Sequence, residues 1–366
     1  DSTSNQAALH HQSGIFTNSG KITIGVTLSI NGPGLYNQAV FNNNSDGEIY
    51  IDGVTNTGFG SALGNNSNYN TTASFTNAGK IVIGAAFEAG NSGVYNGYNS
   101  IFTNNAGAEI SIDRIRIQTY EFNNNTYSYS GNGLHNSYTF INSGKITIGS
   151  AVNGGSHGLF HYSGVFTNNS GAEISIDHIL DSGSNNNGLY SNSTFTYSGK
   201  ITIGSAVSGG IHGLFNANVF SNNSGAEISI DHVSNNDMYG NSHGLFNTNT
   251  FTNAGKITIG STASAGHNGL YNASTFNNNA GAEITIDHVM DTLTPLNTHG
   301  LRNDNNFTNA GKITIGGTAA AGQWGLWNAS TFNNNATGEI NISRSDTCGL
   351  RNGSYNDGSN FINAGK

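Results

Sequence analysis

Five aspartates are the first candidates for chemistry in this chain, because they recur at one place, the end of the phrase E-I-x-I-D. Carboxylates repeated on one face of a protein are ligands that calcium prefers. In the alternate copies of the phrase a glycine takes this place, so we expect successive aspartates to lie roughly 10 Å apart. That is too far to share an ion that binds oxygen at about 2.3–2.6 Å. We therefore predict turn-capping carboxylates, with neither a metal nor a lyase site, at Asp52, Asp113, Asp177, Asp231 and Asp287.

Histidines form the second candidate set. Within one repeat, His232 and His243 could meet across a loop, but a zinc site needs a third ligand. The spacing also singles out no Ser-His-Asp or Cys-His arrangement. The sequence therefore predicts surface or corner histidines, no cofactor and no enzymatic activity. Three of them follow an aspartate of the first set and four precede a Gly-Leu step: His178, His232 and His288, and His157, His212, His243 and His299.

The elements that must position these residues belong to a repeat anchored on phenylalanine. One phrase reads F-x-N-x-G-K-I-x-I-G, as in "FTNSGKITIG" from Phe16, and alternates with F-x-N-N-x-x-G-x-E-I-x-I-D, as in "FTNNSGAEISID" from Phe166. A third apolar step, such as Gly213-Leu214-Phe215-Asn216, usually falls six residues before the next phenylalanine. Each unit thus has three short β-rich runs between glycine and asparagine turns, and no helical period.

Stacking of such units predicts the fold. A unit of this size cannot bury its apolar side alone, but copies stacked in register can. We predict an all-β, three-sided, right-handed parallel β-helix, a β-solenoid of about 13 coils in a two-coil repeat, with residues 1–366 as one segment cut from a longer array. Strand alternation turns Leu214, Phe220 and Ile228 inward and Glu227 outward. An asparagine stands two residues after each phenylalanine that anchors a repeat, with Tyr197 as the only exception, and predicts an inward amide ladder.

Charge is concentrated in one column of this solenoid. Every lysine of the chain occupies the position before the first isoleucine of the third strand, although the last of them, Lys366, is the final residue. Lysine and glutamate alternate at this position from coil to coil. Equivalent residues should lie about 4.8 Å apart, so alternation makes every neighbour an opposite charge. A slip by one coil would place like charges side by side, so the column specifies the register. The central members of this charge column are Lys145, Glu173, Lys200, Glu227, Lys256 and Glu283.

A second column, after each Gly-Leu pair, is mainly aromatic and should point outward. Such a stripe is larger than the apolar patches that monomers normally expose. The sequence leaves open whether neighbouring loops cover it, whether it only stabilises the sheet, or whether it contacts another copy of the chain or a sugar polymer. The loop that follows each glutamate-type coil varies in length and marks a binding edge or a permissive corner. The aromatic positions are Tyr36, Tyr95, Phe160, Tyr190, Phe215, Phe246, Tyr271 and Trp327.

The phrases "FTNSGKITIG" and "FNNNAGAEITID" resemble the right-handed β-helix repeats of large secreted bacterial surface adhesins, of the filamentous-haemagglutinin and autotransporter kind. The resemblance covers essentially all 366 residues. It implies a non-enzymatic, extracellular, cell-surface rod that displays a binding surface as part of an adhesin or a multi-chain filament. The expected partners are copies of the chain, in an oligomer or lateral assembly, and a cell-surface protein or glycan.

Composition narrows the alternatives. Only 9% of the residues are charged, the net charge is −9, and no basic patch could hold a phosphate backbone, so we expect no nucleic acid. No apolar run approaches the length of about 18 residues that crosses a membrane, so we expect no membrane insertion. Cys348 is the single cysteine, which excludes an intramolecular disulfide. Two alternatives remain: a β-helix that binds or cleaves polysaccharides, and an ice-binding solenoid suggested by threonines such as Thr194 and Thr196.

Overall fold

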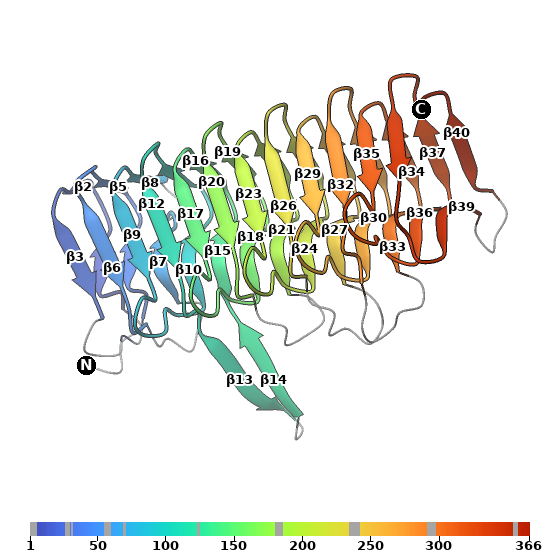
Figure 1. The fold of residues 1–366 in the computed structure, drawn as a ribbon. Coiled ribbons are helices and arrows are strands. Elements are labelled where there is room, and N and C mark those ends of the chain that lie inside the picture. Colours follow the sequence, from blue (N-terminus) through green and yellow to red (C-terminus); the bar gives the residue numbers. More distant parts are fainter. Residues whose placement is uncertain are drawn as a thin grey trace. The chain divides into compact units, whose positions relative to one another are not determined.

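The computed structural model describes residues 6–25, 30, 32–54, 60–68, 71–122, 125–179, 186–233, 242–290, 298–353 and 358–366, with the backbone alone at 117–122 and 125–130. The chain forms two compact units, Asp1–Ser182 and Gly183–Lys366. Each unit contains three parallel sheets, A, B and C, and the described residues contain no helix. Figure 1 shows the strands of each unit stacked side by side. The predicted all-β parallel solenoid with three sheets is confirmed.

In the first unit, each coil contributes one strand to each sheet, and neighbours in a sheet come from successive coils. Sheet A contains β1 (Leu9–His11), β4 (Leu35–Asn37), β7 (Ser61–Asn65), β10 (Ser92–Asn96), β15 (Asn132–Asn136) and β18 (His157–His161). Sheet B contains β2 (Ile15–Asn18), β5 (Val40–Asn43), β8 (Ala73–Asn77), β11 (Ser100–Asn104), β16 (Thr139–Asn142) and β19 (Val165–Asn168). Sheet C contains β3 (Lys21–Ile24), β6 (Glu48–Ile51), β9 (Lys80–Ile83), β12 (Glu109–Ile112), β17 (Lys145–Ile148) and β20 (Glu173–Ile176).

The second unit repeats this arrangement. Its sheet A contains β21 (Asn187–Ser191), β24 (His212–Asn216), β27 (His243–Asn247), β30 (Asn268–Asn272), β33 (His299–Asn303), β36 (Trp324–Asn328) and β39 (Cys348–Asn352). Its sheet B contains β22 (Thr194–Tyr197), β25 (Val219–Asn222), β28 (Thr250–Asn253), β31 (Thr275–Asn278), β34 (Asn306–Asn309), β37 (Thr331–Asn334) and β40 (Asn360–Asn363). Its sheet C contains β23 (Lys200–Ile203), β26 (Glu227–Ile230), β29 (Lys256–Ile259), β32 (Glu283–Ile286), β35 (Lys312–Ile315) and β38 (Glu339–Ile342).

The longest insertion of the first unit forms an antiparallel hairpin instead of a loop. It consists of β13 (Ile117–Phe122) and β14 (Asn125–Ser130), and Figure 1 shows it extending away from the three sheets. It lies between sheet C and sheet A, at the corner where the sequence places the loop of variable length. This corner therefore tolerates an element that the parallel sheets do not include.

The core lies inside the three sheets, as alternation predicts. Leu214, Phe220 and Ile228 are 0–1% exposed, whereas Glu227 points into solvent. The inward phenylalanines stack on one another from coil to coil, with ring centroids 4.8 Å apart and planes 7° apart at Phe220 and Phe251. Because equivalent residues pair in register, the rings form a continuous stack within each unit.

The predicted asparagine ladder is confirmed at the corner after sheet B. The side-chain amide of Asn253 donates to Oδ1 of Asn278 (2.8 Å), and that of Asn278 donates to Oδ1 of Asn309 (2.7 Å). At the exception, the fully buried Tyr197 donates its phenol hydroxyl to the carbonyl of Glu227 instead. Oδ1 of the neighbouring Asn222 consequently stays buried without a hydrogen-bond partner.

A second asparagine ladder, which the sequence analysis missed, follows sheet A. Asn216 donates to Oδ1 of Asn247 and Asn247 to Oδ1 of Asn272, each at 2.8 Å. The same amide of Asn247 also donates to the carbonyls of Asn249 (2.8 Å) and Thr275 (2.9 Å). The asparagine that closes each G-L-x-N step was the available signal. Buried amides that satisfy one another in this way hold successive coils in register.

Candidate binding surface on sheet A

The charge column lies on the outer face of sheet C. Glu227 pairs in register with Lys256, and Lys256 with Glu283; in the first unit Lys145 pairs with Glu173. Lys200 likewise lies opposite Glu227 on the neighbouring strand. Among the described members of the column, only Lys312 and Glu339 form an ion pair, with Nζ 3.9 Å from Oε1. The described column is therefore an alternation of exposed charges with few close ion pairs.

Reversing one charge of this column should weaken the fold. Lys256→Glu would place three negative charges in adjacent register positions, at Glu227, 256 and Glu283. We expect a loss of about 1 kcal/mol in the free energy of unfolding. Because the charges are exposed, added salt should shrink this loss. Urea unfolding at low and high salt measures both effects.

The matched control for this prediction is Lys256→Gln, which removes the positive charge without adding a negative one. It should cost clearly less than Lys256→Glu at low salt. If Lys256→Glu and the parent unfold at the same urea concentration in low salt, the column does not contribute to register.

The recurrent aspartates cap the loop of a neighbouring coil. Oδ1 of Asp231 accepts the backbone N–H groups of Thr262 (3.0 Å) and Ala263 (3.2 Å), and Oδ2 accepts the hydroxyl of Ser261 (2.6 Å). Asp113 makes the same kind of contacts, and the five aspartates are 3–8% exposed. The capping prediction is confirmed where these bonds are seen. In the part of the chain that the structure describes, no group of three or more His, Cys, Asp or Glu could hold a metal ion.

Three histidines occupy corners, as predicted. His178, His232 and His288 have positive φ angles of 46–51°, and each places its Nδ1 2.6–2.7 Å from the carbonyl oxygen of a glycine on the neighbouring coil. His232 and His243 are thereby directed to different partners, because His243 stacks on His212 with 5.0 Å between the ring centroids. The suggested meeting across a loop is not observed.

For His243 and His299 the prediction of surface or corner positions was wrong. Both lie on sheet A and are 0–4% exposed. The amide of Asn268 lies between them: it donates to Nδ1 of His243 (3.0 Å) and accepts from Nδ1–H of His299 (2.7 Å). Burial, followed by the nearby Arg302, lowers the pKa of His299 to about 2. Burial, followed by the neighbouring His212, holds the pKa of His243 well below its usual range.

The aromatic column lies on the outer face of sheet A. In the second unit, ring centroids are 5.0 Å apart at Tyr190 and Phe215 and 4.9 Å apart at Phe215 and Phe246 and at Phe246 and Tyr271. Arg302 continues the column, with its guanidinium carbon 4.7 Å from the Tyr271 ring centroid and 4.9 Å from that of Trp327. The column is half-buried, so the rings stack on one another and also face solvent.

In the first unit the same column is interrupted. Tyr95 and Phe160 both pack edge-on against His135, at 5.1 and 4.9 Å between centroids. Gly64 occupies the equivalent position on β7, beside Tyr36. A side chain there would collide with Tyr36, because a Cβ atom would lie 2.8 Å from Cδ2 of that ring. The hydroxyl of Tyr36 also accepts a hydrogen bond from Asn66 (3.2 Å), which fixes the ring beside this glycine.

From β7 onward, each strand of sheet A begins three residues before the aromatic column, at a position that the sequence analysis did not treat as a site. In the second unit this position holds a ring on four of the seven strands, as where His212 contacts Phe215 and Trp324 contacts Trp327. The other three strands carry Asn187, Asn268 and Cys348 there. In the first unit this position holds the small polar residues Ser61, Ser92 and Asn132, which pair in register. The signal was the residue before each Gly-Leu pair.

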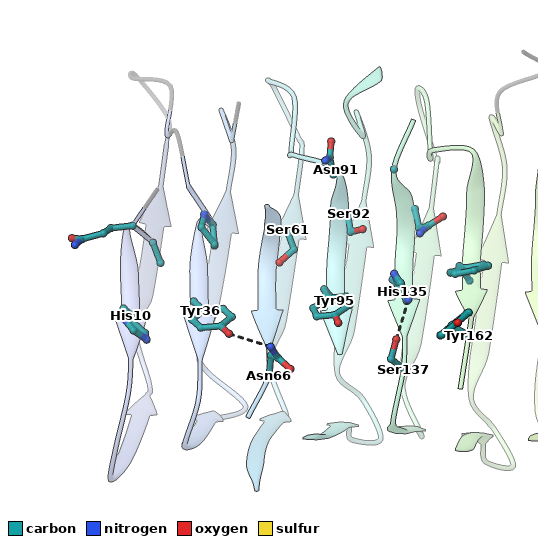
Figure 2. Close-up of a pocket in the computed structure, with 16 residues that line it drawn as sticks. His10, Tyr36, Ser61, Asn66, Asn91, Ser92, Tyr95, His135, Ser137 and Tyr162 are labelled. Atoms are coloured by element: carbon teal, nitrogen blue, oxygen red, sulfur yellow. Dashed lines mark hydrogen bonds between the residues drawn. The ribbon is translucent and has the colours of Figure 1, made fainter. Parts of the chain in front are cut away.

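Small residues at this position leave a groove of about 1120 Å³ on the first unit. Its floor is the outer face of sheet A, and Figure 2 shows its aromatic and polar side chains on successive strands. Polar residues on the turns at both ends of the strands, Asn66, Asn91 and Ser137, form its sides. Nε2 of His135 lies 3.0 Å from the hydroxyl of Ser137. Burial, followed by the nearby His161, lowers the pKa of His135 to about 4, so the ring is neutral at neutral pH.

The threonines of the ice-binding alternative point outward from sheet B. Thr194 is exposed and Thr196 is half-buried on β22, but valine and asparagine take the first of these positions on the equivalent strands, at Val219 and Asn306. A regular threonine array is therefore not formed. No helix in the described part of the chain is long and apolar enough to span a membrane.

Comparisons with known proteins found one similar solved structure. No protein-family model matches the chain, and no curated protein sequence matches it significantly. A solved structure described as "Crystal structure of TibC-catalyzed hyper-glycosylated TibA55-350 fragment" is similar at 15% sequence identity, with a TM-score of 0.32. The alignment covers 94% of this chain and 97% of that one. At this TM-score the assignment of the fold depends on the strand pairings of the chain itself.

Proposed function

We propose that this chain is a non-enzymatic, adhesive β-solenoid of a bacterial cell surface that displays the outer face of sheet A and assembles laterally with copies of itself. The observation that carries this proposal is the half-buried aromatic column of the second unit. The resemblance of its repeats to those of large secreted adhesins supports the extracellular location. We further propose that the solenoid is right-handed, because connections between parallel strands of one sheet are nearly always right-handed. We also propose that it has about 13 coils.

The stacked rings of the second unit favour a second copy of the chain as partner. Tyr190, Phe215, Phe246 and Tyr271 follow one another without a gap, so together they offer a continuous apolar strip. Aromatic side chains provide much contact area and lose little rotamer freedom on binding. The net charge of −9 is spread over 366 residues, so it does not concentrate electrostatic repulsion at the aromatic column. A second copy carries the same strip and can therefore bury it symmetrically.

The non-enzymatic part of the proposal is supported by where the carboxylates lie. Cleavage of a glycosidic bond uses two carboxyl groups placed on either side of the bond. None of the described residues that line the groove is an aspartate or a glutamate. The recurrent aspartates accept hydrogen bonds from the loops of neighbouring coils, as Asp231 does, and their side chains are buried. Binding without cleavage is the function that this arrangement supports.

Removing two central rings should separate the copies. In Phe215→Ser/Phe246→Ser, the outward rings are lost while the inward Leu214 and Leu245 are unchanged. Loss of two interface aromatic residues typically weakens an association by about tenfold or more for each ring. We expect the parent to sediment as an oligomer and the double variant as a monomer, with the same far-ultraviolet circular dichroism. Latex beads coated with the parent should aggregate, and beads coated with the variant should not.

The matched control is Val219→Ser, which removes an exposed apolar side chain from sheet B in the same coil as Phe215. It should leave the sedimentation of the parent unchanged. A parent that is already a monodisperse monomer, or a double variant that unfolds instead of dissociating, would show that the column stabilises the sheet and does not bind a copy.

A further inference from the structure

We propose that the groove on the first unit binds a neutral polysaccharide chain, laid across the strands of sheet A from β4 toward β18. The inference goes beyond self-association through the second unit and shares with it only the use of the same sheet face. It depends on three features of the groove: its charge, the arrangement of its rings and polar groups, and its size.

The groove carries no charged side chain among its described lining residues; the lining consists of aromatic, amide, hydroxyl and small residues together with histidine. The lowered pKa of His135 keeps that ring neutral as well. A polyanion such as nucleic acid or an acidic glycan would need lysine or arginine here. A charged peptide would leave its charges without partners in a groove that has no counter-charge. The chemistry of the lining therefore fits an uncharged ligand rich in hydroxyl groups.

The rings and the polar groups run in two parallel rows. Tyr36, Tyr95 and Phe160 belong to the row of rings, and the apolar faces of pyranose rings pack against aromatic side chains. Ser92 and Asn132 lie in the neighbouring row, and their side chains make no hydrogen bond within the described chain. Figure 2 shows Ser92 and Tyr95 on the same strand of the groove. Each sugar could thus stack on a ring and exchange hydrogen bonds with the adjacent polar row.

Size and strand pairing favour a polymer. The groove volume of about 1120 Å³ exceeds the roughly 300–1,000 Å³ of most small-molecule pockets. Its floor crosses β4, β7, β10 and β15, each of which pairs with a strand on both sides. An extended peptide therefore finds no free strand edge to which it could add. At β18 the ring of His157 stacks on Phe160 with 5.0 Å between centroids and occupies the polar row, so the groove ends there.

Two variants test the groove by different means. Tyr95→Ser removes a ring from the floor, and Ser92→His fills the polar row with the residue that His157 already places at the equivalent position of a nearby strand. The probes are a panel of neutral oligosaccharides and a matched panel of uronic acid oligosaccharides, measured by calorimetry on the full chain. We expect the parent to bind a neutral member with an affinity that does not depend on salt. Each variant should weaken it at least about tenfold.

The controls separate this inference from the proposed function. Phe215→Ser/Phe246→Ser should lose self-association and keep sugar binding, whereas Tyr95→Ser should keep self-association. Circular dichroism checks that each variant is folded. The inference is overturned if no neutral oligosaccharide binds, if acidic oligosaccharides bind better and in a salt-dependent way, or if a folded Ser92→His variant binds as well as the parent. A loss of binding in the Phe215→Ser/Phe246→Ser variant would instead place the sugar site on the second unit.

Discussion

Acidification from pH 6.5 to pH 4.5 is expected to lower the free energy of unfolding by at least about 2 kcal/mol. The cause is the pair of buried histidines, His243 and His299, which are neutral in the folded protein. Once unfolded, each takes up a proton near pH 6.5. His299, whose folded-state pKa is about 2, therefore contributes about 1.4 kcal/mol of destabilisation for every pH unit well below 6.5. His243 adds to this loss in the same direction. Urea unfolding, followed by circular dichroism across this pH range, measures the slope.

The sign of the effect follows from the direction of the pKa shifts. A folded-state pKa below the unfolded value means that the folded state binds fewer protons, so stability is complete above pH 6.5 and is lost as the pH falls. For His299 the loss continues until its folded pKa of about 2 is reached.

The surroundings of the two rings explain why protonation is costly. Nε2 of His299 is buried without a partner, so a proton there would be neither solvated nor hydrogen-bonded. The charged or titratable groups that face the pair are His212, His267, Arg302 and Arg351. Each of them lowers the pKa of His243, of His299 or of both, because a positive charge on it would repel a proton on these rings. Arg302 is itself paired with Asp304 at 2.7 Å, so this carboxylate is already engaged.

The variant His243→Asn/His299→Asn should flatten the acid slope while the protein stays folded at neutral pH. Asparagine is a natural occupant of this position, since Asn268 holds it on the strand between the two histidines. The control is His232→Asn, because His232 lies at a corner with φ of 46°, a conformation that asparagine tolerates. An acid slope that survives in the first variant would assign the effect to other groups.

Asn278→Ala is expected to cost about 3 kcal/mol in the free energy of unfolding. The buried amide of Asn278 accepts from Asn253 and donates to Asn309, so its removal leaves polar atoms on two neighbouring coils without this partner. An unsatisfied buried polar group typically costs about 1–3 kcal/mol. Thermal and urea unfolding should both show the loss.

The adjacent residue provides the control. Asn277 points outward from the same strand and makes no side-chain hydrogen bond within the described chain, so Asn277→Ala should change stability by less than about 0.5 kcal/mol. Equal effects of the two substitutions would show that the ladder does not stabilise the coil stack.

The parts of the fold that depend on periodicity could be predicted from the sequence. Leu214, Phe220 and Ile228 alternate with polar residues, and the lengths of the runs define three strands per coil, so the direction of each side chain and the parallel pairing follow. The charge column at Lys256 was visible because identical spacing brings each coil into the same register. These features are repeated many times, and each repeat indicates the same side-chain directions and the same strand pairing.

The groove could not be predicted in the same way, because it forms where a few coils carry a small polar residue in place of a ring, three residues before the aromatic column. Ser92 and Asn132 are unremarkable in a chain rich in serine and asparagine, and only the comparison with His212 and Trp324 on equivalent strands shows that they leave space. Burial of His243 and His299 also depends on neighbouring coils, through the amide of Asn268. Such properties arise from contacts between repeats and are not encoded in the periodicity of any single one.

The asparagine ladders give each unit a direction. In every bond of the run from Asn222 through Asn253 and Asn278 to Asn309, the donor belongs to the earlier coil and the acceptor to the later one. A completed coil therefore presents oriented N–H groups to the segment that comes next along the chain. Growth from the N-terminal toward the C-terminal side satisfies each amide as the new coil arrives, so the solenoid can be laid down vectorially, in the order in which a ribosome or an export channel releases it.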